Sequence, residues 1–333
     1  MPSPTLLYSF IDRADRTLSG FQVALHERRG GLVSIFLHGL FHDQAEVSQR
    51  LAYPQQDTTI EVFSDFIKYF QNAGYTFISP EDLLTPLQPR GRYGIITFDD
   101  GYFNNTRVIP VLEKYKVPVT VFVSVRHVLE QKAYWWESLY RFRRAQGRDM
   151  REIADEAFHL NLLRTEVAER RLQDEFGSEF LVPGGDLDRP VTVDELRSFA
   201  AHPLVSIGNH TFNHNVLTAY EPGEIRDSIR AAQESLANIV GKPPVCIAYP
   251  NGEVTPEIAQ IASEEGLRLG FSTVPRKEYL PQVLDTKRRM VIGRFCPTAA
   301  SNYRQQYRFF RSDLMLTNRL RSLKRTVGAK HGI

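Results

Sequence analysis

The sequence predicts an α/β fold in which parallel strands are joined by helices. Short apolar runs rich in β-branched residues alternate with amphipathic stretches along most of the chain, which favours strands connected by crossover helices. In addition, polar motifs directly follow three of these runs, and catalytic residues of α/β barrel enzymes come from the ends of strands. We expect strands near residues 32–37, 75–79, 93–98, 118–124, 204–209, 245–249 and 269–273.

Composition narrows the class of protein. With 333 residues, of which 42% are hydrophobic, the chain is long enough for one large barrel with insertions. A net charge of +2 is far from the strongly basic character of a dedicated nucleic-acid binder, so we expect no nucleic-acid partner. Cys246 and Cys296 are too few for a disulfide framework and favour a reducing compartment. The N-terminal residues lack the features of a secretory signal, and no segment resembles a membrane span, so we expect a cytoplasmic protein.

A helix is expected from about Glu61 to Asn72. Thr58 and Thr59 precede it, and a threonine side chain at this place can accept a hydrogen bond from the first turn. Gly74 follows it, and glycine often ends helices because it adopts left-handed backbone angles without strain. Both ends of this helix therefore have a physical cause in the sequence.

Asp99 and Asp100 directly follow the strand predicted over residues 93–98, and Gly101 then breaks the run. Successive strand side chains point to opposite faces, so both carboxylates reach one pocket only if the strand ends between them. One carboxylate can then bind a metal while its neighbour stays free as a base. The alternative is an ordinary Asp-Asp-Gly turn without a chemical role.

His210 and His214 follow the strand predicted over residues 204–209. A spacing of four brings both imidazoles to one side if the segment makes a single helical turn. Neutral imidazole is a common zinc ligand, and two His with one Asp leave a coordination position open, as in catalytic rather than structural sites. The alternative is a surface turn with two solvated histidines, since a chain with nine histidines shows such a spacing by chance.

The third motif is a Tyr-Pro turn over residues 249–252, at the end of the strand predicted over residues 245–249. Pro250 and Gly252 are the residue types that tight turns favour. A turn at the end of a strand leaves backbone N–H groups free, and such groups can stabilise an oxyanion as it forms. Asn251, in the same turn, is a candidate for contact with a substrate.

The three motifs together resemble those of a known family. Thr97-Phe-Asp-Asp-Gly101, His210-Thr-Phe-Asn-His214 and Ala248-Tyr-Pro-Asn-Gly252 occur in the order found in the polysaccharide deacetylases, also called the NodB-homology or carbohydrate esterase 4 group. The similarity spans roughly residues 31–295. It implies a distorted (β/α)7 barrel, here with a helical insertion and a basic C-terminal helical tail.

The resemblance also implies a role for each motif. Asp99 matches the catalytic base of the family. Asp100, His210 and His214 match the ligands of a divalent metal, for which we expect zinc. Tyr249 matches the residue whose backbone N–H helps to hold the oxyanion.

The sequence departs from the family pattern at two places. Many members carry an arginine that orients the base where this chain has Ala248, a variant similar to that of exopolysaccharide and surface-glycan deacetylases. The family also often supplies a general acid from a Leu-x-His motif near the C-terminus, whereas His331 is the only histidine after His214. The usual acid is therefore missing.

His38 is our candidate for the missing acid, because a positioned acid must protonate the leaving amine. It follows the strand predicted over residues 32–37, where a barrel places it on the catalytic rim. Two alternatives stay open: His38 only caps a buried strand, or Asp99 returns the proton that it took from water. His331 is the least suitable acid, since terminal residues are usually mobile.

A long insertion, mostly helical and charged, is expected between Val125 and Thr192, including residues 150–176. Trp135 and Trp136 lie at its start and are the two tryptophans of the chain. Their rings can stack on the sugar rings of a substrate, or they can anchor the insertion onto the barrel. We expect the insertion to determine substrate selectivity, since loops on a rigid scaffold usually do so.

The C-terminal tail has a different composition from the barrel, which we assign to residues 1–300. Arginines, lysines and apolar residues interleave over residues 303–325, which predicts basic amphipathic helices within a tail of residues 301–333. Such helices can lie on anionic lipid and make a peripheral contact with the inner face of the membrane. The alternative is a helix that packs its apolar face on the barrel and leaves a basic side in solvent.

These features predict a metal-dependent hydrolase that removes an N-acetyl or related acyl group from an amino sugar of a bacterial surface polysaccharide or its lipid-linked precursor. Two other interpretations stay open. One is a catalytically inactive glycan-binding module that retains the metal site, which the missing acid suggests. The other is a deformylase or a cyclic-amide hydrolase on the same type of barrel. No feature of the sequence indicates an oligomeric state.

Overall fold

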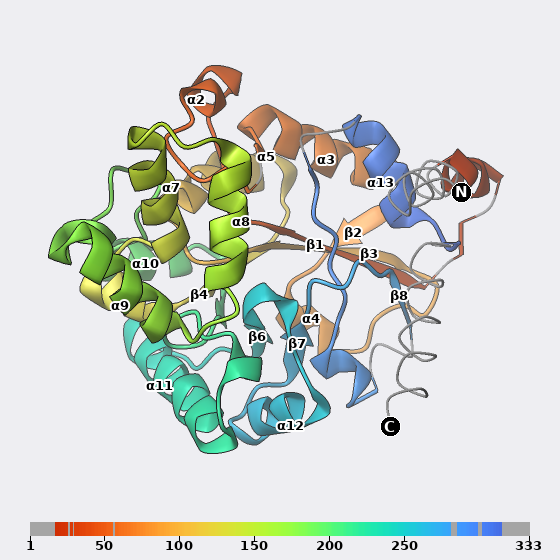
Figure 1. The fold of residues 1–333 in the computed structure, drawn as a ribbon. Helices are drawn as coiled ribbons and strands as arrows, with labels where there is room; N and C mark the ends of the chain where they lie inside the picture. The colour runs from red at the N-terminus through yellow and green to blue at the C-terminus, as the bar shows by residue number, and fades with distance from the viewer. Residues whose placement is uncertain are drawn as a thin grey trace, which may run out of the picture.

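The computed structural model describes residues 17–25, 27–28, 30–55, 57–280, 285–298 and 302–314 (Figure 1). Several expectations fall outside these residues. They concern the N-terminal residues read for a secretory signal, the tail after residue 314, and His331.

An eight-stranded sheet forms the centre of the fold and confirms the predicted α/β class. Its strand order is β7-β6-β5-β4-β3-β1-β8, with β2 paired to β3, and its pairings are parallel except for that of β1 with β8. The seven predicted strands are present with ends shifted by a few residues. The strands are β1 Gly31–Leu37, β2 Tyr75–Phe77, β3 Arg92–Phe98, β4 Val119–Val123, β5 Val205–Asn209, β6 Cys246–Ala248, β7 Leu269–Phe271 and β8 Glu278–Tyr279.

A short segment, residues 292–295, joins the two ends of the sheet. The backbone of Ile292 exchanges hydrogen bonds of 2.8 Å with β7, and that of Phe295 exchanges bonds of 2.8 and 3.0 Å with β1. The sheet therefore curls into the distorted barrel that the family resemblance implied. Sequence analysis placed no strand here, because Gly293 and Arg294 interrupt the apolar run.

Apolar clusters cover both faces of the sheet, and two of them are the following. One fills the inside of the curl with side chains such as Leu32, Phe122 and Phe271. The other packs the apolar faces of α3, α5, α10 and α11 on the outside. The helices surround the sheet (Figure 1). They are α2 Gln44–Gln49, α3 Ile60–Asn72, α4 Pro80–Leu83, α5 Ile109–Tyr115, α6 Val125–Glu130, α7 Trp135–Ala145, α8 Met150–Leu160, α9 Thr165–Phe176, α10 Val193–Ala200, α11 Pro222–Val240, α12 Pro256–Glu264 and α13 Tyr303–Arg311.

The helix expected from Glu61 is α3, and its ends have the predicted causes. The side chain of Thr59 accepts a hydrogen bond of 3.3 Å from the backbone N–H of Val62, which caps the first turn. Gly74 follows the last turn with φ 78°, a left-handed conformation that favours glycine. The buried face of α3 consists of Phe63, Phe66, Ile67 and Phe70.

The insertion is helical, as predicted, and has its own core. It contains α6 to α9 and the short 3-10 helix η2, Ser178–Leu181. Trp135, Leu139 and Phe180 are among the side chains that it buries. The predicted helical stretch over residues 150–176 divides into α8 and α9, because residues 161–164 form a turn between them.

The described part of the tail packs on the barrel. Helix α13 buries Tyr307 and Phe310, and the phenol of Tyr307 approaches the backbone of α3. Arg304 and Arg308 are exposed on the other side of α13. This arrangement matches the alternative in which a basic helix leaves its charged side in solvent. Within the described ranges, no helix has both the length and the apolar character needed to cross a membrane.

Candidate active site

The three motifs meet at the carboxyl ends of β3, β5 and β6. Strand β3 ends at Phe98, and the backbone N–H of Asp99 still donates to the carbonyl of Leu37 at 2.8 Å. Asp100 then turns with φ 75°, so the two carboxylates leave the strand in different directions. The predicted condition for two separate roles, a strand that ends between the aspartates, is met.

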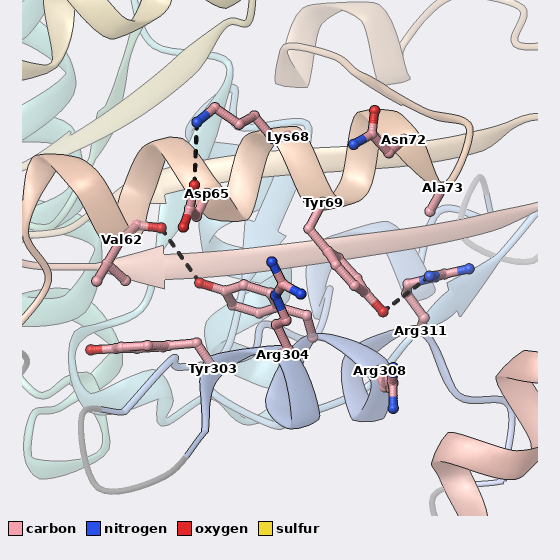
Figure 2. Close-up of a pocket in the computed structure, with 11 residues that line it drawn as sticks. Val62, Asp65, Lys68, Tyr69, Asn72, Ala73, Tyr303, Arg304, Arg308 and Arg311 are labelled. Carbon is pink, nitrogen blue, oxygen red and sulfur yellow. Dashed lines mark hydrogen bonds and ion pairs between the residues drawn. The ribbon is translucent and has the colours of Figure 1, made fainter.

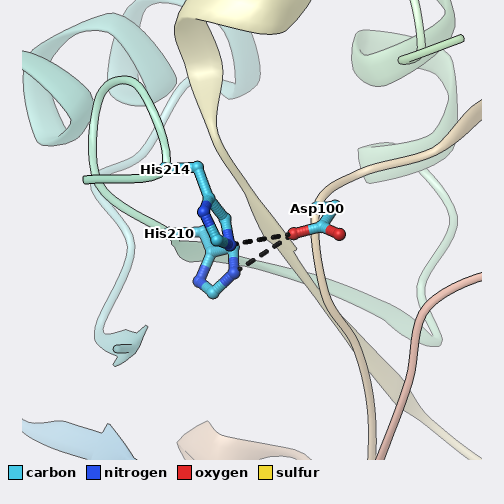
Figure 3. Close-up of side chains that lie close together, drawn as sticks. All are labelled: Asp100, His210 and His214. Carbon is cyan, nitrogen blue, oxygen red and sulfur yellow. Dashed lines mark ion pairs between the residues drawn. The ribbon is translucent and has the colours of Figure 1, made fainter. Parts of the chain in front are cut away.

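Asp100, His210 and His214 form a buried cluster (Figure 3). One carboxylate oxygen of Asp100 lies 3.3 Å from Nε2 of His210 and 3.5 Å from Nε2 of His214. The three potential ligand atoms all lie within 4.8 Å of one another. Sequence analysis predicted this triad, and the fold brings it together from strands that are far apart in the chain.

The donor set fits a metal cation. Nδ1 of His210 lies 2.7 Å from the carbonyl oxygen of Ala248, which can only accept, so Nδ1 carries a proton and the Nε2 of a neutral ring presents a lone pair. Both carboxylate oxygens of Asp100 are buried and accept no hydrogen bond within the described part of the chain. A buried carboxylate that faces imidazole lone pairs is costly unless a cation lies between them. We conclude that these three residues can hold a divalent metal.

The charges of the cluster agree with this conclusion. Burial by itself raises the pKa of Asp100, but the neighbouring imidazoles outweigh it and lower the pKa below its ordinary value. Burial lowers the pKa of His214 to about 4, so this ring is neutral at physiological pH, which is the form that binds metals. Burial also lowers the pKa of His210, but Asp100 and Asp99 raise it above its ordinary value, because their negative charges favour a positive charge at this place, which a metal cation would also supply.

The two histidines reach the cluster through a loop and not through the single helical turn that the sequence analysis considered as the way to bring both rings to one side. Thr211 has φ 63° and His214 has φ 48°, both in the left-handed region. The side chain of Asn209 accepts from the N–H of Thr211 at 2.7 Å, and the hydroxyl of Thr211 accepts from the N–H of Asn215 at 2.8 Å. Left-handed angles are unusual for a β-branched residue, so these bonds hold a strained loop at a functional site.

Asp99 is held by an arginine that sequence analysis did not find. The guanidinium of Arg294 donates to both carboxylate oxygens of Asp99, at 2.6 and 2.8 Å. Arg294 is fully buried, and it also donates to the hydroxyl of Thr97 at 2.9 Å and to the carbonyl of Ser272 at 3.2 Å. It lies over the rings of Phe36 and Phe122, which contribute cation–π contacts.

Arg294 makes the contact that the resemblance implied for an arginine in the third motif, where this chain has Ala248. It comes from the segment between β7 and β1 and contacts Asp99. The sequence signal was a single arginine inside the apolar run from Val291 to Phe295. Burial alone raises the pKa of Asp99, but the charges of Arg294 and His210 hold it below its ordinary value, so Asp99 is ionised.

His38 lies beside these carboxylates, at the end of β1. The chain neighbour of His38, Leu37, accepts a hydrogen bond of 2.8 Å from the backbone N–H of Asp99, and the imidazole is close enough to act electrostatically on Asp99 and Asp100. The side-chain amide of Asn105 donates to the backbone carbonyl of His38 at 2.5 Å, and Asn105 follows the first motif by a few residues. The structure therefore places His38 on the rim next to both aspartates, and its role as an acid stays a prediction.

The structure argues against the role that the resemblance implied for Tyr249. Its backbone N–H donates to the carbonyl of Phe271 at 3.1 Å, within the sheet, and its hydroxyl donates to the carbonyl of Met290 at 3.1 Å. An N–H that pairs with β7 is not available to an oxyanion. Pro250 has no N–H, and the N–H of Asn251 makes no hydrogen bond to the residues that the structure describes. Asn251 is exposed, with φ 56°.

The two tryptophans are buried, which supports the anchoring alternative. Trp135 is 3% exposed and packs edge-on against Trp136, which is 7% exposed. The indole N–H of Trp136 donates to the hydroxyl of Tyr102 at 3.1 Å, and its ring lies 4.7 Å from that of His214. Neither indole leaves a face free for a sugar ring, and Trp136 packs behind His214.

A buried glutamate beside the site was also missed. Glu137 accepts a hydrogen bond of 2.6 Å from the backbone N–H of Tyr53 and one of 3.1 Å from the hydroxyl of Tyr102. It lines a small cavity together with His38 and Asn104. Burial raises the pKa of Glu137 to about 8. The sequence alone does not show which face of α7 is covered, so it did not predict that Glu137, which follows the two tryptophans, is buried.

The raised pKa of Glu137 predicts a pH-dependent stability that a glutamine would remove. Because the pKa is higher in the folded protein than the ordinary value of 4.5, the stabilisation is full below 4.5 and is lost as the pH rises through about 8. We expect Glu137→Gln to flatten the pH dependence of unfolding and to be more stable than the wild type by on the order of a few kcal/mol near pH 9. Denaturant unfolding across this range measures both effects.

The matched control is Glu179→Gln, which removes the same charge from an exposed position of the insertion. It should keep the pH dependence of the wild type. Identical pH profiles for Glu137→Gln and the wild type would show that the carboxyl of Glu137 ionises without cost, against the burial seen here.

Comparison with known proteins places this site in a family. A family model described as polysaccharide deacetylase matches residues 88–270, which is more than half of the chain. A search of curated proteins found no match. The match includes the first two motifs and the strand of the third.

Solved structures share the fold. The deacetylase PplD of Streptococcus pyogenes, solved in complex with acetate, has a TM-score of 0.57 at 16% identity, covering 85% of this chain and 99% of that chain. IcaB from Ammonifex degensii has a TM-score of 0.55 at 18% identity, covering 86% of this chain and 100% of that chain. A de-N-acetylase from Aggregatibacter actinomycetemcomitans has a TM-score of 0.58 at 14% identity, covering 84% of this chain and 99% of that chain.

Identities this low establish a common fold, and the family match establishes more. It covers the strands that carry Asp99, Asp100 and the two histidines, and the structure shows that these strands bring the aspartates and histidines into one buried site. The barrel, the order of the motifs and the possible metal site are those expected of the NodB-homology group. The chain therefore belongs to the polysaccharide deacetylase family, and this membership supports the deacetylation of a polysaccharide as its activity.

Proposed function

We propose that the protein is a metal-dependent N-deacetylase acting on an amino sugar of a bacterial surface polysaccharide or its lipid-linked precursor. One observation carries the proposal. Two adjacent aspartates differ in their surroundings: Asp100 faces two imidazoles and accepts no hydrogen bond from the residues that the structure describes, whereas Asp99 is held by Arg294. A closed structural metal site has no use for the second, ionised carboxylate.

The proposed metal ligands are Asp100, His210 and His214. When bound, a divalent cation at this place supplies a Lewis acid that polarises the acyl oxygen and lowers the pKa of water. Two imidazoles and one carboxylate form a donor set with a position left for a further ligand, which is typical of catalytic zinc. Zinc is therefore the proposed ion.

Asp99 is the proposed general base. Asp99 is ionised, it is not one of the proposed metal ligands, and Arg294 orients both of its oxygens. In the proposed reaction it takes a proton from the water that attacks the acetyl carbonyl. The ion pair keeps the carboxylate beside Asp100 without a side-chain rotation at the moment of proton transfer.

His38 is the proposed acid, supported by its place on the rim next to Asp99 and Asp100. It would give a proton to the amine as the C–N bond breaks. For the oxyanion we propose the N–H of Asn251 in place of that of Tyr249, since the N–H of Asn251 is not used by the sheet. The alternative in which Asp99 returns the proton remains, and the His38 variant described in the Discussion separates the two.

Metal analysis combined with acetate release tests the proposed function. We expect the purified protein to bind one divalent ion and to release acetate from N-acetylated glycans, with activity lost on chelation and restored by zinc. Asp100→Asn should lower metal affinity more than about 100-fold, since it removes a charged ligand directly. Release of formate, or opening of a cyclic amide, from the same substrate panel would favour the other hydrolases.

Asp174→Asn is the control, because Asp174 is an exposed aspartate on α9 away from the cluster. It should bind metal and release acetate as the wild type does. Full activity after complete chelation, or unchanged metal binding by Asp100→Asn, would contradict the proposal. Glycan binding without any turnover would favour the inactive binding module.

A further inference from the structure

A cavity of about 590 Å³ lies between α3 and α13, on the side of the barrel (Figure 2). None of the aspartates and histidines of the active site lines it. Its walls combine phenol rings with cationic side chains from both helices. The residues that matter here are Tyr69, Tyr303, Tyr307, Arg304, Arg308 and Arg311.

The cavity has a surplus of positive charge. Its lining includes Lys68 and three arginines but a single acidic residue, Asp65, which pairs with Lys68 at 3.3 Å. Arg311 is already used, since it pairs with Glu27 at 2.7 Å. Arg304 and Arg308 are exposed, and their guanidinium groups make no ion pair with any residue that the structure describes. Two arginines are thus free to bind an anion, and planar guanidinium groups match carboxylate and phosphate oxygens well.

The aromatic residues form a row beside these arginines. The rings of Tyr303 and Tyr307 stack with centroids 6.2 Å apart, and the ring of Tyr69 lies 5.4 Å from that of Tyr307. Figure 2 shows Arg304 reaching from α13 toward α3 in front of this row. Phenol rings offer flat apolar faces with a polar edge, which suits ligands that have an apolar face and hydroxyl groups at the rim. A sugar ring has this chemistry.

A lipid surface fits the same cavity less well. A helix that binds a bilayer needs an exposed apolar face beside its basic side. In α13 the apolar residues Tyr307 and Phe310 are buried against the barrel, while Arg304, Gln305 and Arg308 are exposed. The observations therefore favour a soluble anionic ligand over membrane insertion by this helix.

We propose that the cavity between α3 and α13 binds an acidic stretch of the glycan substrate, outside the active site. Carboxylate or phosphate groups of the glycan pair with Arg304 and Arg308, and a sugar ring packs on Tyr69 or Tyr303. This inference rests on the proposed function, because it requires a polymeric substrate. The site holds the polymer to the enzyme, so its contribution is to affinity for long acidic chains and not to the chemical step.

Binding of an oligosaccharide of alternating N-acetylglucosamine and glucuronate tests the inference. We expect the wild type to bind it more tightly than a neutral N-acetylglucosamine oligomer, and the double variant R304Q/R308Q to bind it about tenfold more weakly or worse. Tyr303→Ala should weaken binding without any change of charge. The matched control is R170Q/R171Q, which removes two exposed arginines from α9 and should bind as the wild type does.

The outcomes separate this inference from the proposed function. Unchanged binding by R304Q/R308Q overturns the inference, and so does an equal loss in R170Q/R171Q, which would indicate a general effect of charge. Binding to phosphatidylglycerol vesicles is measured for the same proteins. If R304Q/R308Q loses vesicle binding but binds the oligosaccharide as the wild type does, the inference is overturned in favour of a membrane contact. R304Q/R308Q should turn over a short neutral oligomer as the wild type does, because such a substrate does not reach the cavity. If the wild type itself does not turn over this oligomer, the result counts against the proposed function alone.

Discussion

Asp99→Asn should reduce acetate release by about 10²–10⁴-fold while the protein still binds its metal. The amide has nearly the shape of the carboxylate but cannot take a proton from water. Asp100, His210 and His214 are untouched by the change, and their ligand atoms remain within 4.8 Å of one another. Acetate release and metal content are measured on the same preparation, the first to check the loss of turnover and the second to check that metal is still bound.

The comparison variant is His38→Gln, which removes the proposed acid and keeps the metal ligands. If His38 protonates the amine, its loss should also slow turnover, most strongly for amides with the poorest leaving groups. If Asp99 returns the proton, His38→Gln stays nearly as active as the wild type. Retained activity of Asp99→Asn would refute the assignment of the base, and parallel loss of metal would show that Asp99 is itself a ligand.

Arg294→Met should lower both activity and stability. Arg294 is fully buried and donates to both oxygens of Asp99, so its loss leaves a buried carboxylate without a partner. Breaking a buried ion pair by removing one partner typically costs about 3–5 kcal/mol of unfolding free energy. We also expect kcat to fall by about 10²-fold with a smaller change in KM, because Arg294 positions the base and does not contact substrate.

Two further variants make this prediction decisive. Arg294→Lys keeps the charge but cannot donate in a bidentate manner, so it should retain more stability than Arg294→Met while kcat remains low. In the Asp99→Asn background, Arg294→Met should cause little further loss of activity, because both changes act on the same group. Full activity of Arg294→Met and Arg294→Lys, or additive losses in the double variant, would show that Arg294 does not act through Asp99.

Much of the fold was predictable from local patterns. The apolar runs that became β1, β3 and β5 are buried along their length, so the hydrophobic periodicity reports directly on their structure. The ends of α3 were predictable for a similar reason, since Thr59 and Gly74 act within one turn of the helix. The position of Asp99, Asp100, His210 and His214 directly after such strands was predictable in the same way, and the family resemblance then implied which of them form the metal triad.

Other features depend on contacts that no local pattern reveals. The strand-like segment at residues 292–295 has one bridge residue to β1 and one to β7, and Gly293 and Arg294 interrupt its apolar pattern. The left-handed angles at Thr211 and His214 arise from hydrogen bonds to Asn209 and Asn215, so the single helical turn considered for this segment does not form. The commitment of the Tyr249 N–H to β7 likewise follows from strand pairing.

Residue order alone therefore specified the strands and the polar groups at their carboxyl ends, because each of these follows from neighbours a few positions away. Which aspartate joins the two histidines came from the family resemblance of the motifs. The partner of the base came from the packed barrel, where Arg294 meets Asp99 across 195 positions of chain. The burial of Glu137 and the free arginines beside α3 have the same origin. A side chain's charge state and availability depend on what surrounds it in space, and those surroundings exist only once the sheet has closed.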